Sequence, residues 1–343
     1  MRTVLVVIPT LNEVHTIASV IESLRLDPPQ DAHLRFVVAD GGSSDGTVAL
    51  VKSLAREQDD LHLMHNPQRL QGAGINRAVL THGADAEVLI RADAHAGYPR
   101  GFCARLLESL DRSGADAVVV PMDSVGVGCF QQAVAWVSDT LVGSGGAAHR
   151  GGHRSGFVDH GHHAAFLTAT FRRVGGYDTS LLNNEDGDFD CRQRAPSARV
   201  YLDADVRVTY HPRASVKSLA RQYFGYGRGR SCTMRRHPHS ARARQLAVPV
   251  HLVLLLAGLV AAPWWPGLLA WPLAYGAMLL ATSLALTWRH RSLCGLAAGP
   301  AAAVMHTSWA VGFLVSCVRL PQRRWHPQSA LPLGPPPALG GPG

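Results

Sequence analysis

Three long apolar stretches near the C-terminus constrain this chain more than any other feature of its sequence. They cover Leu246–Ala262, Leu268–Trp288 and Leu296–Val318, and none of them contains an Asp, Glu, Lys or Arg. Each is close to the ~20 residues with which an α-helix crosses a bilayer, and most nearby tryptophans lie toward their ends, as in an aromatic belt. We therefore predict a C-terminal membrane region of about three spans rather than the buried helices of a soluble core.

Charged residues are strongly segregated along the sequence. All 25 acidic residues lie at or before Asp205, whereas the chain from Arg213 onward has 14 Lys or Arg and no Asp or Glu. The formal net charge of +8 therefore comes from the second part, and the chain lacks the even basicity expected of a nucleic-acid-binding protein. We expect no nucleic-acid partner.

The basic residues that flank the apolar stretches predict an orientation in the membrane. They precede the first stretch at Arg235–Arg244 and follow the second at Arg289–Arg291. The positive-inside rule then places residues 1–245 and 289–295 in the cytoplasm, as in a multi-pass protein of the cytoplasmic (inner) membrane. A third crossing would export the basic residues that follow it, so the last stretch is either re-entrant or an exception to the rule.

Two further features fit a cytoplasmic location of the N-terminal part. The six cysteines are scattered without a CxxC pair, which argues against a disulfide framework or a Cys-based zinc site and fits a reducing compartment. The N-terminus also lacks the apolar stretch and cleavage site of a signal peptide. We expect this part of the chain to stay in the cytoplasm.

Short β-rich runs alternate with helix-like segments over residues 3–210. Because continuous apolar runs separated by helices are typical of buried parallel strands, we predict an α/β fold with a mostly parallel sheet covered on both faces. Sites in such sheets lie beyond the carboxyl ends of the strands. The predicted strands are Val4–Ile8, Phe36–Ala39, Leu61–His65 and Val88–Ile90, and the predicted helices are Glu13–Leu26, Thr47–Arg56 and Gly72–His82.

Polar side chains follow the predicted strands in three places: residues 9–13 (PTLNE), 40–46 (DGGSSDG) and 91–95 (RADAH). Each segment alone is a weak signal, because Asp-Gly is a common turn and Asn-Glu can cap a helix. Together, at one sheet edge, they predict a nucleotide-diphosphate site. Alternating side chains of a strand point the same way, so Asp93 and His95 could hold one divalent ion that neutralises the diphosphate.

These segments, followed by Asn-Glu-Asp at residues 184–186, resemble the motifs of glycosyltransferase family 2, whose members have a GT-A fold. The resemblance covers about residues 3–230. Within the family, the segments Arg-x-Asp-Ala-His-Ala, Gly-Gly-x-x-His-Arg and Val-Asp-His-Gly-His-His are similar to those of exopolysaccharide glucosyltransferases of the succinoglycan type. The resemblance implies a nucleotide-sugar site formed by Pro9, Thr10, Glu13, Asp40, Gly41, Arg91 and Asp93.

The resemblance also implies a divalent metal, Mn²⁺ or Mg²⁺, bound by Asp93 and His95. The chain departs from the family pattern here, because His95 stands where a DxD motif has its second Asp. A neutral imidazole can ligate either ion, but it shifts the preference of the site toward Mn²⁺. His211, before Pro212, is a third candidate ligand.

Residues 184–192 contain four carboxylates within six residues. Taken alone, they favour a solvated helix N-terminus, where the helix dipole stabilises acidic groups. Taken with the upstream site, one of them completes an inverting single displacement by deprotonating the hydroxyl of the acceptor. We predict Asp186 in this role, with Glu185 as the alternative.

Five histidines lie between His149 and His163, which invites a zinc interpretation. Two of them are followed directly by Arg, the segment has no Cys, and glycine dominates it, so the spacing argues against zinc. We predict instead a glycine-rich acceptor loop with Asp159, His160 and His163 near the sugar.

The basic segment before the first apolar stretch contains Gln222-Tyr-Phe-Gly-Tyr-Gly-Arg228-Gly-Arg230. Its position resembles the Gln-x-x-Arg-Trp element of processive relatives, although the match is incomplete. We predict that Gln222, Arg228 and Arg230 bind the diphosphate and a lipid-linked acceptor. Arg235–Arg244 would attract anionic lipid, at about 1 kcal/mol per basic residue.

The sequence thus predicts four regions: a GT-A catalytic domain (1–212), a basic juxtamembrane segment (213–245), a transmembrane region (246–320) and a Pro/Gly-rich tail (321–343). The expected activity is inverting transfer of a hexose, glucose from UDP-glucose, onto a polyprenyl-diphosphate-linked saccharide in exopolysaccharide or cell-surface glycan synthesis. The expected partners are the nucleotide-sugar donor, this acceptor, the lipid bilayer and other polysaccharide-assembly enzymes.

Three alternatives to this activity differ from it in substrate or in class of protein. The enzyme could transfer a sugar directly to polyprenyl phosphate. A membrane metal-binding or sensor protein could use the histidine-rich loop. A dinucleotide-dependent oxidoreductase is excluded, because the first predicted strand is followed by Pro-Thr-Leu-Asn-Glu and not by GxGxxG.

Overall fold

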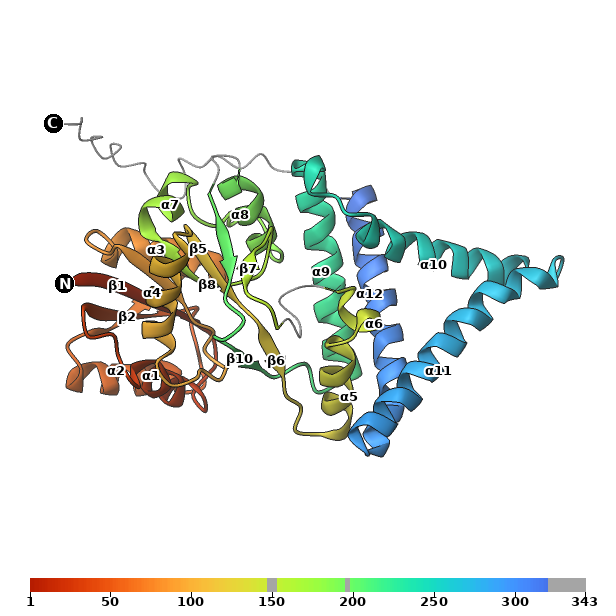
Figure 1. The fold of residues 1–343 in the computed structure, drawn as a ribbon, viewed down its shortest axis with the longest axis horizontal. Helices are drawn as coiled ribbons and strands as arrows, with labels where there is room; N and C mark the ends of the chain where they lie inside the picture. The colour runs from red at the N-terminus through yellow and green to blue at the C-terminus, as the bar shows by residue number, and fades with distance from the viewer. Residues whose placement is uncertain (147–152, 195–197, 320–343) are drawn as a thin grey trace.

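The computed structural model describes residues 1–146, 153–194 and 198–319 (Figure 1). Within these residues the main sheet has eight strands in the order β3-β2-β1-β4-β8-β5-β9-β7. Its strands are β1 (Arg2–Thr10), β2 (Ala32–Asp40), β3 (Leu61–His65), β4 (Val88–Arg91), β5 (Ala117–Val120), β7 (Gly156–Phe157), β8 (His162–Leu167) and β9 (Val200–Leu202). Neighbouring strands are parallel except where β8 meets β4 and β5 and where β7 meets β9. The predicted mostly parallel sheet is confirmed.

Helices cover both faces of this sheet: α1 (Ile17–Arg25), α2 (Thr47–Glu57), α3 (Gln71–His82), α4 (Phe102–Ser113), α7 (Thr168–Arg173) and α8 (Glu185–Arg194). The side chains of β1 show why, because Val4, Val6 and Ile8 pack into one apolar core while Leu5 and Val7 pack into the other. A strand buried on both sides needs the continuous apolar run from which it was predicted.

The chain continues into a helical region made of α9 (Val216–Arg236), α10 (Ala243–Ala261), α11 (Ala270–His290) and α12 (Ala298–Arg319). Of the described residues, three segments are long and apolar enough to cross a membrane: Ala243–Ala261, Pro266–His290 and Leu293–Val318. In Figure 1, α10 and α11 project from the body as a V, whereas α12 runs beside α9. The third apolar stretch is one continuous helix, which packs more closely against the protein than the other two.

Glycines allow α9 and α12 to approach very closely. A Cβ atom added to Gly227 would lie 2.0 Å from the carbonyl oxygen of Trp309, and one added to Gly312 would lie 2.1 Å from that of Phe224. Both distances are far below van der Waals contact, so backbone packs directly on backbone at this crossing. The basic helix α9 is therefore joined to the most buried of the apolar helices.

This crossing predicts that Gly227→Ala destabilises the protein. The added methyl group meets backbone that cannot rotate away, and overpacking of this kind costs about 1–3 kcal/mol. We expect a lower Tm of the detergent-purified protein in a thermal unfolding experiment. Gly276→Ala on α11 is the matched control, since an added Cβ there meets no described atom within 4 Å beyond its own helix and chain neighbours. An equal loss of Tm in both variants would contradict the close crossing.

A smaller group of elements links the sheet to the helices. It comprises β6 (Met122–Ser124), which pairs with β10 (Val208–Tyr210), and the helices α5 (Cys129–Ser138) and α6 (Leu141–Ser144). Apolar residues of α5 share a core with Leu219 of α9 and with residues of α11 and α12. Part of the chain before residue 212 thus packs on the C-terminal helices, and the predicted domain boundaries remain predictions.

The structure corrects the expectation drawn from the cysteines. Cys129, at the start of α5, forms a disulfide with Cys294 in the short helix η3 (Leu293–Ala297) before α12. The two residues are 165 positions apart in the sequence. Spacing along the chain carries no information about such a pair, because the contact exists only once the helices have packed.

Candidate active site

The carboxyl ends of β1, β2 and β4 border one large cleft of about 1250 Å³, whose far side is formed by α8, α9 and α12. Parallel strands end at the same edge of a sheet, which is why residues far apart in the sequence meet here. Most predicted site residues line the cleft: Pro9, Thr10, Glu13, Gly41, Arg91, Asp93, His95, His160, Glu185, Asp186, Gln222 and Arg230. Five do not line it: Asp40, Asp159, His163, Arg228 and His211.

Asp40 shapes the loop after β2 instead of facing the cleft. Its Oδ2 accepts hydrogen bonds from the backbone N–H groups of Gly42 (2.7 Å) and Ser43 (3.0 Å), and its Oδ1 accepts one from the Ser43 hydroxyl (2.5 Å). The Ser43 Oγ also receives the backbone N–H of Asn12 at 2.8 Å. Asp40 therefore ties the first two loops of the site together, and its contact with a nucleotide remains a prediction.

The strand argument for Asp93 and His95 is wrong. The strand β4 ends at Arg91 and the residues after it form a turn, so side-chain alternation does not apply to them. The Nδ1 atom of His95 lies 2.9 Å from Oε1 of Glu13. A glutamate from the first loop thus orients the imidazole.

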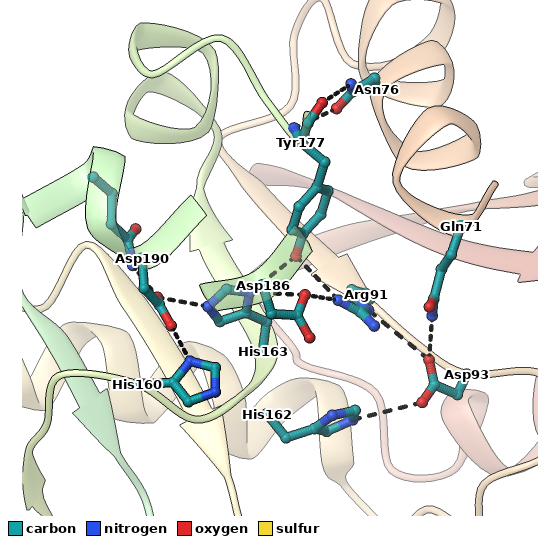
Figure 2. A network of polar contacts seen from close by, with 11 residues as sticks. Gln71, Asn76, Arg91, Asp93, His160, His162, His163, Tyr177, Asp186 and Asp190 are labelled. Atoms are coloured by element: carbon teal, nitrogen blue, oxygen red, sulfur yellow. Dashed lines mark hydrogen bonds and ion pairs between the residues drawn. The ribbon is translucent and has the colours of Figure 1, made fainter. Parts of the chain in front are cut away.

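Asp93 is held by side chains that the sequence did not single out (Figure 2). Its Oδ1 accepts a hydrogen bond from Gln71 Nε2 at 2.6 Å, and its Oδ2 lies 3.7 Å from Nε2 of His162. Burial raises the pKa of Asp93, but Arg91 and His162 outweigh this effect and lower the pKa below its usual value. The carboxylate is therefore held in its charged form.

The remaining donor set fits a divalent ion that is shared with a phosphate ligand. His211 does not line the cleft, and its Nδ1 lies 3.0 Å from the backbone oxygen of Val125. No group of three or more His, Cys, Asp or Glu that could hold a metal occurs among the described residues. Asp93 and the Nε2 of His95 nevertheless suit an ion that takes its other ligands from a diphosphate, and Glu13 at Nδ1 is the partner that a metal-bound histidine usually has.

The histidine-rich loop was the basis of the alternative interpretation as a metal-binding or sensor protein. Over residues 153–163, which the structure describes, its histidines form no such metal-binding group. His149 lies outside the described residues. The alternative of a metal sensor that uses this loop gains no support from the described part.

Asp186, at the start of α8, lies against the guanidinium of Arg91 (Figure 2). Burial raises the pKa of Asp186, but Arg91 and His163 outweigh it and hold the pKa well below its usual value. Arg91 is itself buried, and its Nη1 also donates to the Tyr177 hydroxyl at 3.2 Å. Its Nε is buried without a hydrogen-bond partner in the described residues and lies 3.9 Å from Oδ1 of Asp93.

Glu185 precedes Asp186 and also lines the cleft. Burial, followed by the negative charge of Asp186, raises the pKa of Glu185 to about 7. Two adjacent carboxyl groups therefore differ in protonation near neutral pH, a separation that is typical of acid–base sites.

Asp159 and His163, which were predicted to lie near the sugar, do not line the cleft. Because neighbouring residues of a strand point to opposite faces, His162 lines the cleft while His163 is fully buried. Asp159 is exposed and forms ion pairs with Arg194 (2.9 Å) and Arg242. Of the three predicted residues only His160 borders the cleft, and the missed residue, His162, stood in the same histidine segment.

Two of the three residues predicted to bind the diphosphate, Gln222 and Arg230, line the cleft from α9, and their role there remains a prediction. Gln222 donates to the Tyr210 hydroxyl at 3.0 Å, and Arg230 donates from Nε to Oε1 of Gln245 at 3.0 Å. Arg228 does not line the cleft. Four further arginines line it that were not singled out for the site. Arg213, Arg221 and Arg244 belong to the acid-free region, whose composition was a signal for them, and Arg69 follows β3.

Comparisons with known proteins agree with this geometry. Residues 5–175 match the family Glycosyl transferase family 2. The chain is 39% identical over 312 residues to the succinoglycan biosynthesis protein ExoA of Rhizobium meliloti, covering 90% of this chain and 93% of that protein. It is 22% identical over 250 residues to a dolichyl N-acetyl-alpha-D-glucosaminyl phosphate 3-beta-D-2,3-diacetamido-2,3-dideoxy-beta-D-glucuronosyltransferase of Methanococcus voltae, covering 69% and 75%.

A solved structure supports the fold. The mannosyltransferase PcManGT from Pyrobaculum calidifontis, in complex with GDP-Man and Mn²⁺, superposes with a TM-score of 0.59 at 20% identity, covering 92% of this chain and 87% of that one. The predicted GT-A architecture is confirmed. The family motifs lie at one edge of the sheet, and a relative matches the chain almost end to end. This chain therefore belongs to glycosyltransferase family 2 and is a glycosyltransferase.

Proposed function

We propose that this enzyme transfers glucose from UDP-glucose, with inversion, onto a saccharide carried by polyprenyl diphosphate. The transfer would take place at the cytoplasmic face of the inner membrane, during exopolysaccharide or cell-surface glycan synthesis. The name of the Rhizobium relative supports the polysaccharide, and that of the Methanococcus relative supports a lipid-linked substrate. Other polysaccharide-assembly enzymes would act beside it.

The observation that carries the proposal is the continuation of the cleft into an apolar cavity between α10, α11 and α12. This cavity has a volume of about 360 Å³ and is lined by Ala247, Val248, His251, Trp271, Ala274, Tyr275, Met278 and His306. Val248, Met278 and His306 line both the cavity and the cleft. A charged cleft that opens into an apolar cavity suits an amphiphile, with its diphosphate beside Arg230 and Arg244 and its chain among the helices.

The chemistry follows from the carboxylates at the other end of the cleft. Asp186 would accept the proton of the acceptor hydroxyl, whose oxygen attacks C1 of the sugar while the bond from C1 to the diphosphate breaks. One displacement from the opposite side inverts the configuration at C1. A divalent ion, Mn²⁺ or Mg²⁺, would supply positive charge to the leaving diphosphate, and Asp93 and His95 would hold it.

A donor screen on membranes that contain the enzyme tests this function. Sugar nucleotides are supplied with polyprenyl-diphosphate-linked saccharides or with polyprenyl phosphate, and both the released nucleoside diphosphate and the lipid product are measured. We expect UDP and a glucosylated lipid-linked saccharide with an inverted linkage. A product formed on polyprenyl phosphate alone would establish the alternative of direct transfer, and a retained anomeric configuration would overturn the single displacement.

The lipid cavity makes a separate prediction for Ala274→Trp. The indole would occupy the space that the lipid chain needs, so we expect the KM for the lipid-linked acceptor to rise roughly ten-fold, equivalent to about 1.4 kcal/mol. The KM for a short-chain, water-soluble acceptor should not change. Leu273→Trp is the control, because Leu273 is 68% exposed on the outer face of α11. Equal effects on the long-chain and short-chain acceptors would argue against a lipid in this cavity.

A further inference from the structure

Two carboxylates on α8 face the same buried histidine. Asp186 and Asp190 are four residues apart, so they lie one helical turn apart on one side of the helix. His163 of β8 lies between them: its Nε2 is 2.8 Å from Oδ1 of Asp190, and its Nδ1 is 3.5 Å from Oδ1 of Asp186. Figure 2 shows the imidazole placed between the two acids.

The cluster is largely buried, so its charged groups interact strongly with one another. The side chains of His163 and Asp190 are 0% and 2% exposed, whereas that of Asp186 is 21% exposed and borders the cleft. A charged imidazole donates from both nitrogens, and here Nε2 faces Asp190 while Nδ1 faces the Tyr177 hydroxyl and Asp186. Burial lowers the pKa of His163, but Asp190, Tyr177 and Asp186 together outweigh it and raise the pKa well above its usual value. His163 and Arg91 thus balance the two carboxylates.

Tyr177 closes the arrangement into a ring. Its hydroxyl lies 3.0 Å from Nδ1 of His163 and receives Nη1 of Arg91 at 3.2 Å, and both of these residues contact Asp186. The backbone of Tyr177 is anchored by Asn76, which accepts its N–H at 2.8 Å and donates to its carbonyl at 2.7 Å. The carboxylate of Asp186 thus contacts two groups, Arg91 and His163, that Tyr177 holds in place. It therefore has little freedom to rotate.

Asp190 is anchored in its turn. Its Oδ1 also accepts from Nε2 of Gln193 at 2.8 Å, and its Oδ2 lies 2.5 Å from Nδ1 of His160. Both carboxylate oxygens of Asp190 therefore have hydrogen-bond partners. Asp190 in turn fixes the position of the His163 imidazole relative to α8. We propose that His163, backed by Asp190, is a positioning residue that fixes the carboxylate of Asp186 for proton acceptance. This inference rests on the proposed role of Asp186 in transfer.

The same helix provides a matched control. Asp188 of α8 pairs with His237, whose Nε2 lies 3.0 Å from its Oδ1. This pair is also buried on the carboxylate side, since the side chain of Asp188 is 2% exposed. It faces α9 rather than the cleft and has no contact with Asp186 among the described residues. A variant of His237 therefore shows the effect of losing a buried imidazole–carboxylate pair in general. A variant of His163 shows the effect of losing the pair beside Asp186.

The test measures His163→Gln, Asp190→Asn and His237→Gln in the full-length membrane protein. We expect roughly ten- to hundred-fold lower kcat for the first two, because a small displacement of a reacting group costs this much. Their UDP affinity and donor KM should stay within about three-fold of wild type. His237→Gln should keep kcat within about two-fold. Wild-type kcat in His163→Gln, or equal kcat losses in His163→Gln and His237→Gln, would overturn the inference.

A double-mutant comparison separates positioning from general stabilisation. If His163 acts only through Asp186, then adding His163→Gln to Asp186→Asn should lower kcat by less than about three-fold further. A further loss as large as that of the single variant would overturn the proposal. Tyr177→Phe keeps the ring but removes the bridging hydroxyl, so a reduced kcat with unchanged UDP affinity is expected even if His163→Gln does not fold. Full turnover by Asp186→Asn itself would instead show that the proposed function had failed.

Discussion

Asp186→Asn is expected to lower kcat by roughly 10²- to 10⁴-fold, the usual contribution of a general base, while donor affinity stays within a few-fold. The amide keeps the size of the carboxylate at the start of α8 but cannot accept the proton of the acceptor hydroxyl. The measurement is UDP release in the presence of a lipid-linked acceptor, with UDP-sugar binding determined separately. Wild-type turnover in this variant would remove Asp186 as the base.

The neighbouring Glu185 provides the discriminating control. Arg91 and His163 hold the pKa of Asp186 low enough to keep its carboxylate charged across the neutral range, so a reaction that uses it shows no acidic limb near pH 7. The pKa of Glu185 is raised to about 7. If Glu185 were the base, kcat/KM would rise with pH around that value, because only the deprotonated form accepts a proton.

For Glu185→Gln we therefore expect more than a tenth of the wild-type kcat and an unchanged pH profile. A pH limb near 7 in the wild type that disappears in Glu185→Gln would transfer the role of base to Glu185. The two variants alter adjacent residues on the same helix turn, so a general disturbance of α8 should affect both.

Asp93→Ala is expected to weaken both the donor and the divalent ion. The carboxylate lies in the cleft with Gln71 and His162 as its partners, and its removal takes away the charged ligand of the proposed ion. Loss of a hydrogen bond to a charged group costs about 1.5–3 kcal/mol, which corresponds to a roughly 10- to 150-fold rise in the Kd for UDP-sugar. Titration calorimetry with Mn²⁺, and with UDP-sugar in the presence and absence of EDTA, measures both effects.

The control for this variant is Asp85→Ala, which removes a carboxylate paired with Arg35 at the protein surface. It should leave both affinities within about two-fold, because its charge is exposed to solvent and screened. Unchanged donor affinity in Asp93→Ala would place the metal elsewhere. A lost donor affinity that EDTA does not reproduce in the wild type would instead show that Asp93 acts on the donor without an ion.

The elements that could be predicted from sequence are those with a strong local pattern. The strands β1 and β2 are continuous apolar runs because both of their faces are buried, and the three apolar C-terminal stretches are uninterrupted by charge because their helices expose apolar side chains. The convergence of Glu13, Arg91 and Asp93 on one cleft followed from a single rule, that parallel strands end at the same edge.

The errors share a physical cause. The side-chain alternation of a strand was applied to Asp93 and His95, although β4 ends at Arg91, and His163 was placed in the cleft when its neighbour His162 lies there. The end of a strand and the face on which a residue lies depend on pairing with other strands. An extended sequence pattern cannot locate either to within one residue, and a shift of one residue reverses the direction of every side chain.

The sequence by itself determined the family, the α/β fold, the apolar helices and the residue types of the catalytic edge, because those features depend on composition and on patterns between near neighbours. Only the tertiary structure decided that His163 lies behind Asp186 with Asp190, that Cys129 meets Cys294, and that α12 packs on α9. These contacts join residues far apart in the chain. Their existence depends on how packed elements face one another, which no local pattern encodes.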